Sequence, residues 1–271
     1  MIRRRPQFEM WTVRAFLAAI ILLGPVGHPA FAADADRNDL LNRTSDQVSK
    51  FLGQFADVKC TEKVTQEKLG KEDKVELKEE STYDYLVILT NNGGELSLDE
   101  SRLAVHEAKV DKRNTSLLVT NGFATLFLVF HPYYVQNFQF TEAGHESVNG
   151  HLLNKVSFQH IRGTRSIVAL ALRGKEYPLE LSGMAWIDPQ TGMIQKITAD
   201  IGDTMQDVGL KTLRSEVEYA PVPFRGMKET YWFPSQATVE VETQRQHWRN
   251  THRFTDYKRF SVDTEEQVAN K

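Results

Sequence analysis

The chain has 271 residues, with 25% charged and 41% hydrophobic side chains and a formal net charge of −3. Without residues 1–32 it carries 29 basic and 35 acidic residues, a net charge of −6. This balance does not favour nucleic acid or an anionic membrane surface as a partner, because both are recognised by clustered Lys and Arg. The only cysteine, Cys60, excludes an intramolecular disulfide, and we interpret it as a small buried apolar residue.

The N-terminus has the layout of an export signal. Arginines precede an apolar run over residues 15–26, which is too short to span a bilayer. The small residues of Ala30-Phe31-Ala32 then suit a signal peptidase. We predict a signal peptide over 1–32, a mature periplasmic chain beginning near Ala33, and a single domain over 33–271 without a transmembrane segment. An uncleaved N-terminal anchor is the alternative.

The first predicted element of the mature chain is an amphipathic helix. Its apolar stripe consists of Leu41, Val48, Phe51 or Leu52, and Phe55. Asn38 or Asp36 is available as the N-cap. From Val58 onward the apolar period changes to two, and the segment 74–90 predicts a long strand with one solvated face.

A very apolar segment follows in the middle of the chain. Phe123, Leu126, Phe127 and Phe130 recur at helical spacing, and Pro132 ends the pattern. We predict a short helix over 122–130. Because apolar residues also occupy its other faces, we expect it to be buried on more than one side.

The rest of the chain alternates strands and turns. Asn149-Gly150 is a two-residue hairpin signal, and residues 237–244 alternate apolar and polar side chains. Asp188 could be a catalytic carboxylate, but in Asp188-Pro189-Gln190-Thr191-Gly192 it stands at the first position of a turn between two strands. We interpret it as a turn residue. The count is roughly ten antiparallel strands, too many for a small flat sheet.

Together these features resemble the LolA/LolB-like superfamily of periplasmic lipoprotein carriers. The resemblance rests on the export signal without a lipidation cysteine, the first helix, the long meander, the central helix and the strand-DPQTG-strand turn followed by FPSQATVEVE. It implies a mainly β (α+β) fold: a strongly curved antiparallel meander or unclosed β-barrel, with an N-terminal helix and a central apolar helix covering the concave face. It also implies that this face holds a lipid or the acyl chain of a lipoprotein.

No motif predicts catalysis, a metal site or a cofactor. His247 and His252 are five residues apart on a strand and therefore lie on opposite faces, so we expect solvated surface histidines. The carboxylates of Asp200, Asp203 and Asp207 lack the spacing of a calcium loop. The sequence contains no G-x-S-x-G, H-E-x-x-H or phosphate-binding loop, and we expect a protein that is not an enzyme.

Bulky apolar residues on alternating strand positions are the candidate lining of an acyl cavity. They are Phe138, Phe140, Val156, Phe158, Trp186, Val239, Val241, Trp248 and Phe254, together with Phe127 of the predicted central helix. A carrier, which we expect to be a monomer, would keep an open cavity there. A periplasmic interaction or envelope-stress sensing module would instead fill this face and use its exterior. The cavity volume distinguishes the two.

Overall fold

The structure is a computed structural model, which describes residues 29–92, 95–104, 126–172, 175–201, 205 and 209–260. The predicted signal peptide lies almost entirely outside these residues. Two helical elements precede and interrupt the strands: helix α1 (Pro29–Ala56) and the 3₁₀ helix η2 (Leu126–Phe130). Two further 3₁₀ turns are η1 (Lys71–Asp73) and η3 (Val135–Asn137). The strands are β1 (Val58–Leu69), β2 (Val75–Asn92), β3 (Glu95–Ala104), β4 (Phe138–Val148), β5 (His151–His160), β6 (Ala169–Leu172), β7 (Lys175–Pro178), β8 (Leu181–Ile187), β9 (Ile194–Ile201), β10 (Leu210–Pro223), β11 (Thr230–Thr243) and β12 (His247–Arg259).

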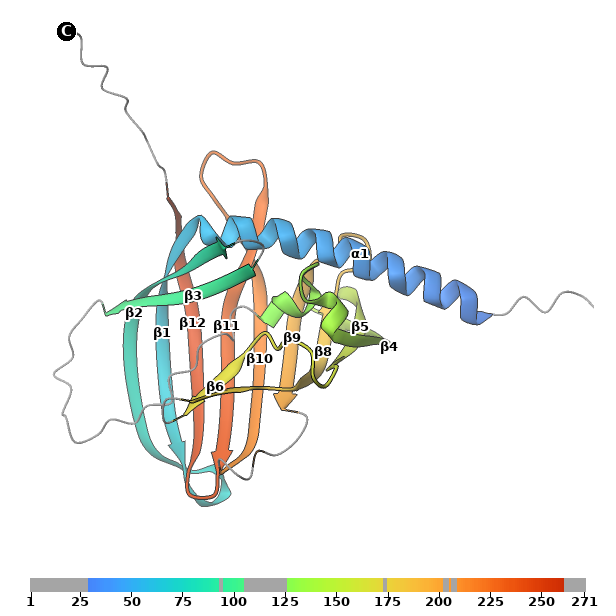
Figure 1. The fold of residues 1–271 in the computed structure, drawn as a ribbon. Coiled ribbons are helices and arrows are strands. Elements are labelled where there is room, and N and C mark those ends of the chain that lie inside the picture. Colours follow the sequence, from blue (N-terminus) through green and yellow to red (C-terminus); the bar gives the residue numbers. More distant parts are fainter. Residues whose placement is uncertain are drawn as a thin grey trace, which may run out of the picture.

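Ten of the strands form one antiparallel sheet in the order β3-β2-β1-β12-β11-β10-β9-β8-β5-β4. The first and the last strand of the described residues, β1 and β12, pair along most of their length, so segments from opposite ends of the described chain lie side by side inside the sheet. Strands β3 and β4 are its two edges, and they do not pair with each other. The expected strongly curved, unclosed antiparallel sheet with an N-terminal helix is confirmed (Figure 1).

Side chains alternate between two faces of this sheet. On β11, Ala237, Val239 and Val241 are buried, while Thr238 and Glu240 between them are partly exposed. We call the face with the buried side chains the inner face and the opposite one the outer face. Helix α1 runs across one end of the sheet (Figure 1), and its buried residues join the same core as the inner face.

Helix α1 begins earlier than predicted. The predicted N-cap at Asn38 or Asp36 is wrong, because the helix already starts at Pro29. The alanine-rich segment before Asn38 has high helix propensity, and proline is favoured at a first helical position. The predicted apolar stripe is confirmed for Val48, Phe51, Leu52 and Phe55, whereas Leu40 rather than Leu41 is its buried N-terminal member.

The central apolar segment is a tighter helix than predicted. Residues 122–125 lie outside the described part of the chain, and Leu126–Phe130 form a 3₁₀ helix in which every residue is buried. The backbone N–H of His131 donates to the carbonyl of Leu128 at 2.9 Å, a three-residue step. Short 3₁₀ segments are common where tertiary packing, rather than helix length, stabilises the backbone. Its end before Pro132 is as predicted.

The turn at Asp188 has the predicted chemistry. Its Oδ1 accepts the backbone N–H groups of Gln190 at 2.9 Å and Thr191 at 2.8 Å, which confirms a turn residue. The turn also touches α1: Arg43 Nη2 donates to the Pro189 carbonyl at 3.0 Å. Gly192 has φ +73° and packs so closely on the helix that a Cβ atom there would lie 2.7 Å from the carbonyl carbon of Arg43. The turn therefore holds α1 in place on the sheet.

Candidate functional site

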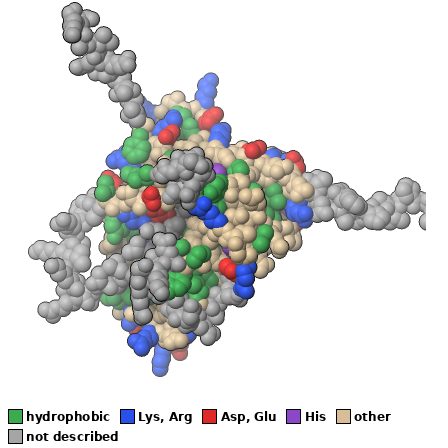
Figure 2. All heavy atoms as spheres, viewed as in Figure 1, with side chains coloured by type: hydrophobic (Ala, Val, Ile, Leu, Met, Phe, Trp, Pro, Cys, Tyr) green, Lys and Arg blue, Asp and Glu red, His purple; other side chains and the backbone are tan. Residues whose placement is uncertain are grey.

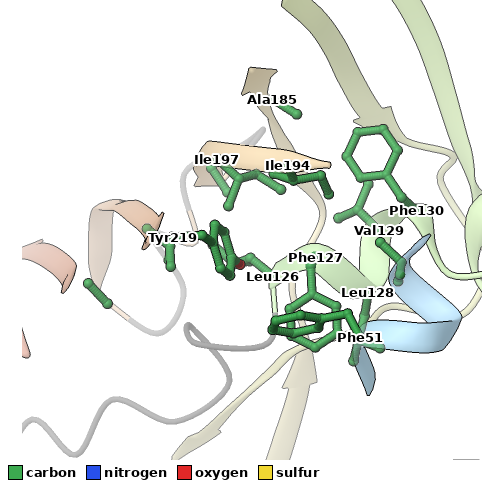
Figure 3. Close-up of a cluster of buried hydrophobic side chains, with 14 of the residues drawn as sticks. Phe51, Leu126, Phe127, Leu128, Val129, Phe130, Ala185, Ile194, Ile197 and Tyr219 are labelled. Atoms are coloured by element: carbon green, nitrogen blue, oxygen red, sulfur yellow. The ribbon is translucent and has the colours of Figure 1, made fainter. Parts of the chain in front are cut away.

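Aromatic side chains fill the space between α1, η2 and the inner face. The ring of Phe51 on α1 meets that of Phe127 on η2 edge-on, with centroids 4.5 Å apart. Figure 3 shows these two rings side by side, with Ile194, Ile197 and Tyr219 of the sheet around them. Phe55, one turn further along α1, stacks on Phe233 of β11 at 5.6 Å. The helices and the sheet therefore share a surface of aromatic and aliphatic side chains.

The space left within this cluster is small. A pocket of about 20 Å³ lies between α1 and the sheet, which is roughly the room of one water molecule. Its lining consists of Gln47, Val48, Phe51, Phe127, Gly192, Met193, Ile194, Tyr219 and Trp232. An acyl chain does not fit this pocket, so such a ligand there would have to displace side chains.

Most of the predicted cavity residues come together in the buried core. These are Phe127, Phe138, Val156, Phe158, Val239, Val241 and Phe254, with Phe140 packed against them and partly exposed. The rings of Phe138 and Phe158 are 6.0 Å apart, and Phe158 lies 6.3 Å from Phe130 of η2. Trp248 is also buried and shares the inner side of β12 with Phe254, but it stands apart from this cluster.

Trp186 lies on the outer face. Its neighbours along β8, Ala185 and Ile187, are fully buried, so the alternation turns Trp186 the other way. The ammonium groups of Lys155 and Lys196 lie 5.5 Å and 5.1 Å from its ring, and its Nε1 donates to Glu146 at 3.0 Å. Nearly every residue of LSGMAWI is apolar or small, so the sequence alone does not show which side chains of this strand face inward.

A charged network on the inner face was missed by the sequence analysis. Arg102 of β3 donates to both carboxylate oxygens of Glu62 on β1, at 2.6 Å and 2.9 Å. His252 Nδ1 lies 2.8 Å from the same carboxylate, and Glu100 is 3.0 Å from Arg102. Glu62 is fully buried. The prediction that the histidines lie in solvent is therefore wrong for His252, because the β1–β12 pairing carries it into the core beside a partner.

The pKa values in this network follow from burial and pairing. Burial by itself raises the pKa of Glu62, but the hydrogen bonds from His252 and Arg102 outweigh it and hold that pKa below its usual value. Burial, and next the charge of Glu100, raise the pKa of Tyr85 beside them. One signal was present in the sequence: in VKCTEKV, Glu62 occupies the strand phase of Val58, Cys60 and Val64.

Cys60 behaves as the sequence predicted. It is a free cysteine, 3% exposed, on the inner face of β1. Burial raises the pKa of its thiol to about 12, against the smaller opposing effect of a hydrogen bond with Tyr257. A thiol that stays protonated and covered is a packing group rather than a nucleophile.

Neither a cluster of metal ligands nor a membrane-spanning helix is present among the described residues. No group of three or more His, Cys, Asp or Glu side chains among them could hold a metal ion, although Asp203 and Asp207 lie outside this part. Within the same residues, none of the helices combines the length and apolar character needed to cross a membrane.

No family model and no curated protein matches the chain. Among solved structures, a DUF1329 family protein from Desulfovibrio piger is 14% identical and covers 83% of this chain and 92% of its own, with a TM-score of 0.41. A putative outer membrane lipoprotein-sorting protein domain from Vibrio parahaemolyticus is 12% identical, with 83% and 94% covered and a TM-score of 0.39. Lipoprotein LppX from Mycobacterium tuberculosis is 11% identical, with 83% and 99% covered and a TM-score of 0.22.

Proposed function

We propose that this chain is an exported cell-envelope protein that binds or carries a lipid or the acyl chain of a lipoprotein, without catalysing a reaction. One observation carries the proposal: α1 and η2 share a continuous aromatic and aliphatic surface with the inner face of an unclosed sheet. A carrier needs such an apolar surface, and it needs a structural element that can move away from this surface to admit the ligand. Helix α1 is held there by side-chain packing and by the turn at Gly192, not by strand pairing.

The energetics of binding are those of apolar transfer. The pocket of about 20 Å³ is too small for an acyl chain, so binding requires the Phe51 and Phe127 rings to move apart. Each methylene that leaves water contributes about 0.8 kcal/mol, so a long chain can offset the cost of parting a few buried rings. The net affinity is then modest, in the micromolar range, with little specificity for the headgroup.

The place of action follows from the export signal, which is part of the proposal. Cleavage near Ala33 would remove the first turn of α1 and leave its buried stripe from Leu40 onward intact. The mature chain over 33–271 would then be one periplasmic domain and a monomer. Its N-terminal sequence, read from protein recovered from the periplasm, tests this directly.

A second candidate function is a periplasmic interaction or envelope-stress sensing module without a small-molecule ligand. The observation in its favour is the small size of the pocket beside α1, about 20 Å³ among the described residues. Such a module would work through its outer face and its sheet edges.

A titration distinguishes the two functions. The chain from Ala33 is titrated with a fluorescent fatty-acyl probe, alongside Phe158→Ala and Trp186→Ala, and the melting temperature of each variant is measured. Phe158 lies on the inner face and Trp186 on the outer face, so they are matched aromatic positions on opposite sides of the sheet. We expect saturable binding that Phe158→Ala weakens several-fold and Trp186→Ala leaves unchanged. Absence of saturable binding to the folded wild type would favour the interaction module.

A further inference from the structure

An open groove lies on the outer face of β2, β1 and β12, away from the aromatic core. It has a volume of about 450 Å³, the size of a small-molecule site. The lining residues are Lys63, Val64, Thr65, Glu67, Lys78, Glu80, Ser81, Thr82, Thr251 and Arg253. Nothing in the proposed function uses this groove.

Two cations of the lining stand opposite each other on adjacent strands. Lys63 on β1 pairs directly with Arg253 on β12, and both side chains are exposed. Neither forms an ion pair with any residue in the described part of the chain. Like charges directly opposite on adjacent strands destabilise a sheet, and their Cβ atoms are only about 5 Å apart. The arrangement therefore costs free energy unless something neutralises it.

The neighbours of this pair are neutral hydrogen-bonding groups. On the same face of the sheet, the next β1–β12 pair on one side is Thr65 with Thr251, and on the other side it is Thr61 with Thr255. Across the flanking strands, Thr82 of β2 stands opposite Lys63, and Gln236 of β11 stands opposite Arg253. Hydroxyl groups and an amide thus surround the two cations on all four sides.

The nearby carboxylates form their ion pairs with other cations, and the charge of Lys63 also acts on Glu80 from a longer distance. Glu80 forms an ion pair with Lys78 at 2.8 Å, and Glu67 lies 3.8 Å from Arg249. Asp84, the next acidic residue along β2, lies 3.7 Å from Lys59. The lining therefore holds three cations, Lys63, Lys78 and Arg253, against two carboxylates, Glu67 and Glu80, although the chain as a whole is acidic.

We propose that this groove is a binding site for a phosphate-type oxyanion. Lys63 and Arg253 supply the two charges, and the guanidinium of Arg253 can donate two hydrogen bonds to one phosphate. The hydroxyls of Thr65, Thr82 and Thr251 donate to its remaining oxygens. The phosphate belongs either to a small soluble molecule or to an anionic lipid headgroup, and both offer the same chemistry to the groove.

The site stands apart from the acyl proposal. It lies on the outer face, whereas the aromatic core lies on the inner face of the same sheet. Failure of acyl binding would leave the groove unaffected, and a groove that binds no anion would leave the acyl proposal standing. The two can therefore be tested on one preparation.

The test uses the folded chain from Ala33 and two probes at matched ionic strength. Inorganic phosphate is titrated by calorimetry and by thermal unfolding, with chloride as the reference anion. Vesicles of phosphatidylcholine with and without phosphatidylglycerol are assayed by sedimentation. The variants are Lys63→Met and Arg253→Gln, and the matched control is Arg225→Met, an exposed arginine in the β10–β11 turn.

We expect phosphate to raise the melting temperature of the wild type, and each groove variant to bind it at least tenfold more weakly. Without phosphate, Lys63→Met should melt at the same temperature as the wild type or higher, because it removes a repulsion. Binding only to phosphatidylglycerol vesicles, lost in both groove variants, would support the site and assign a lipid headgroup as its source. No binding to either probe, or an equal loss with Arg225→Met, would overturn the proposal.

Discussion

The buried charged network offers the sharpest test of how the inner face is held together. Glu62→Gln keeps the shape of the side chain and removes its charge. In the wild type this carboxylate is fully buried and accepts two hydrogen bonds from Arg102, while His252 lies 2.8 Å away. Removing one partner of a buried ion pair costs about 3–5 kcal/mol, because the other charge remains in the core. Arg102 keeps Glu100 at 3.0 Å, so we expect the lower end, about 3 kcal/mol.

The assay is urea unfolding followed by tryptophan fluorescence and circular dichroism. A loss of about 3 kcal/mol should lower the midpoint without changing the slope, and it should lower the melting temperature by about 6–12 °C for a domain of this size. The matched control is Glu216→Gln, whose partner Lys196 is 2.7 Å away but whose side chain is 41% exposed. A surface pair contributes at most about 1 kcal/mol. If both variants shifted the midpoint equally, the reasoning on burial would be refuted.

Three further predictions follow from single contacts. The folded-state pKa of Glu62 lies below the ordinary value of 4.5, so its contribution to stability is present above that value and is lost as the pH falls below it. In urea titrations from pH 7 to 3, the unfolding free energies of the wild type and Glu62→Gln should therefore converge. A constant difference between them would contradict this. Gly192→Ala should lower the free energy of unfolding in urea by about 1–3 kcal/mol, because its Cβ would meet the backbone of Arg43 and its φ is +73°. The control is Gly226→Ala, at an exposed position with φ +85° and nothing near its Cβ. It measures the cost of the backbone conformation without the contact. Cys60 should resist a thiol reagent in the native state and react only as fast as the protein unfolds, because its thiol is buried and its pKa is raised to about 12. Rapid labelling of the folded protein would contradict the burial.

The surface of the molecule shows why composition alone misses the outer groove. Figure 2 shows basic and acidic side chains interspersed over the face in view, without a large region of one sign. A net charge of −3 describes this average. The pairing of β1 with β12 nevertheless brings Lys63 and Arg253, which are 190 positions apart in the chain, into direct opposition.

Much of the fold was accessible from local patterns. Period-two alternation located the long strands, because successive side chains on a strand point to opposite faces whatever the strand pairs with. Turn chemistry was equally local: Asn149-Gly150 adopts the positive φ values of 51° and 81° that a two-residue hairpin requires, and Asp188 binds its own turn. The stripe Val48, Phe51, Leu52 and Phe55 was readable for the same reason, since helical spacing places those side chains on one face.

The candidate site depended on tertiary structure. The register between strands decides which face of β8 carries Trp186 and whether Glu62 meets Arg102 and His252. This register joins residues that are far apart in the chain, so the local alternation of side chains does not reveal it. The small size of the pocket beside α1 is an outcome of packing, because an apolar side chain looks the same in sequence whether it touches another side chain or lines a cavity. By itself the sequence determined where strands and turns lie and which residues are apolar. Only the pairing of distant strands decided which charges are buried together, which stand opposed on the surface, and how little space the aromatic rings leave.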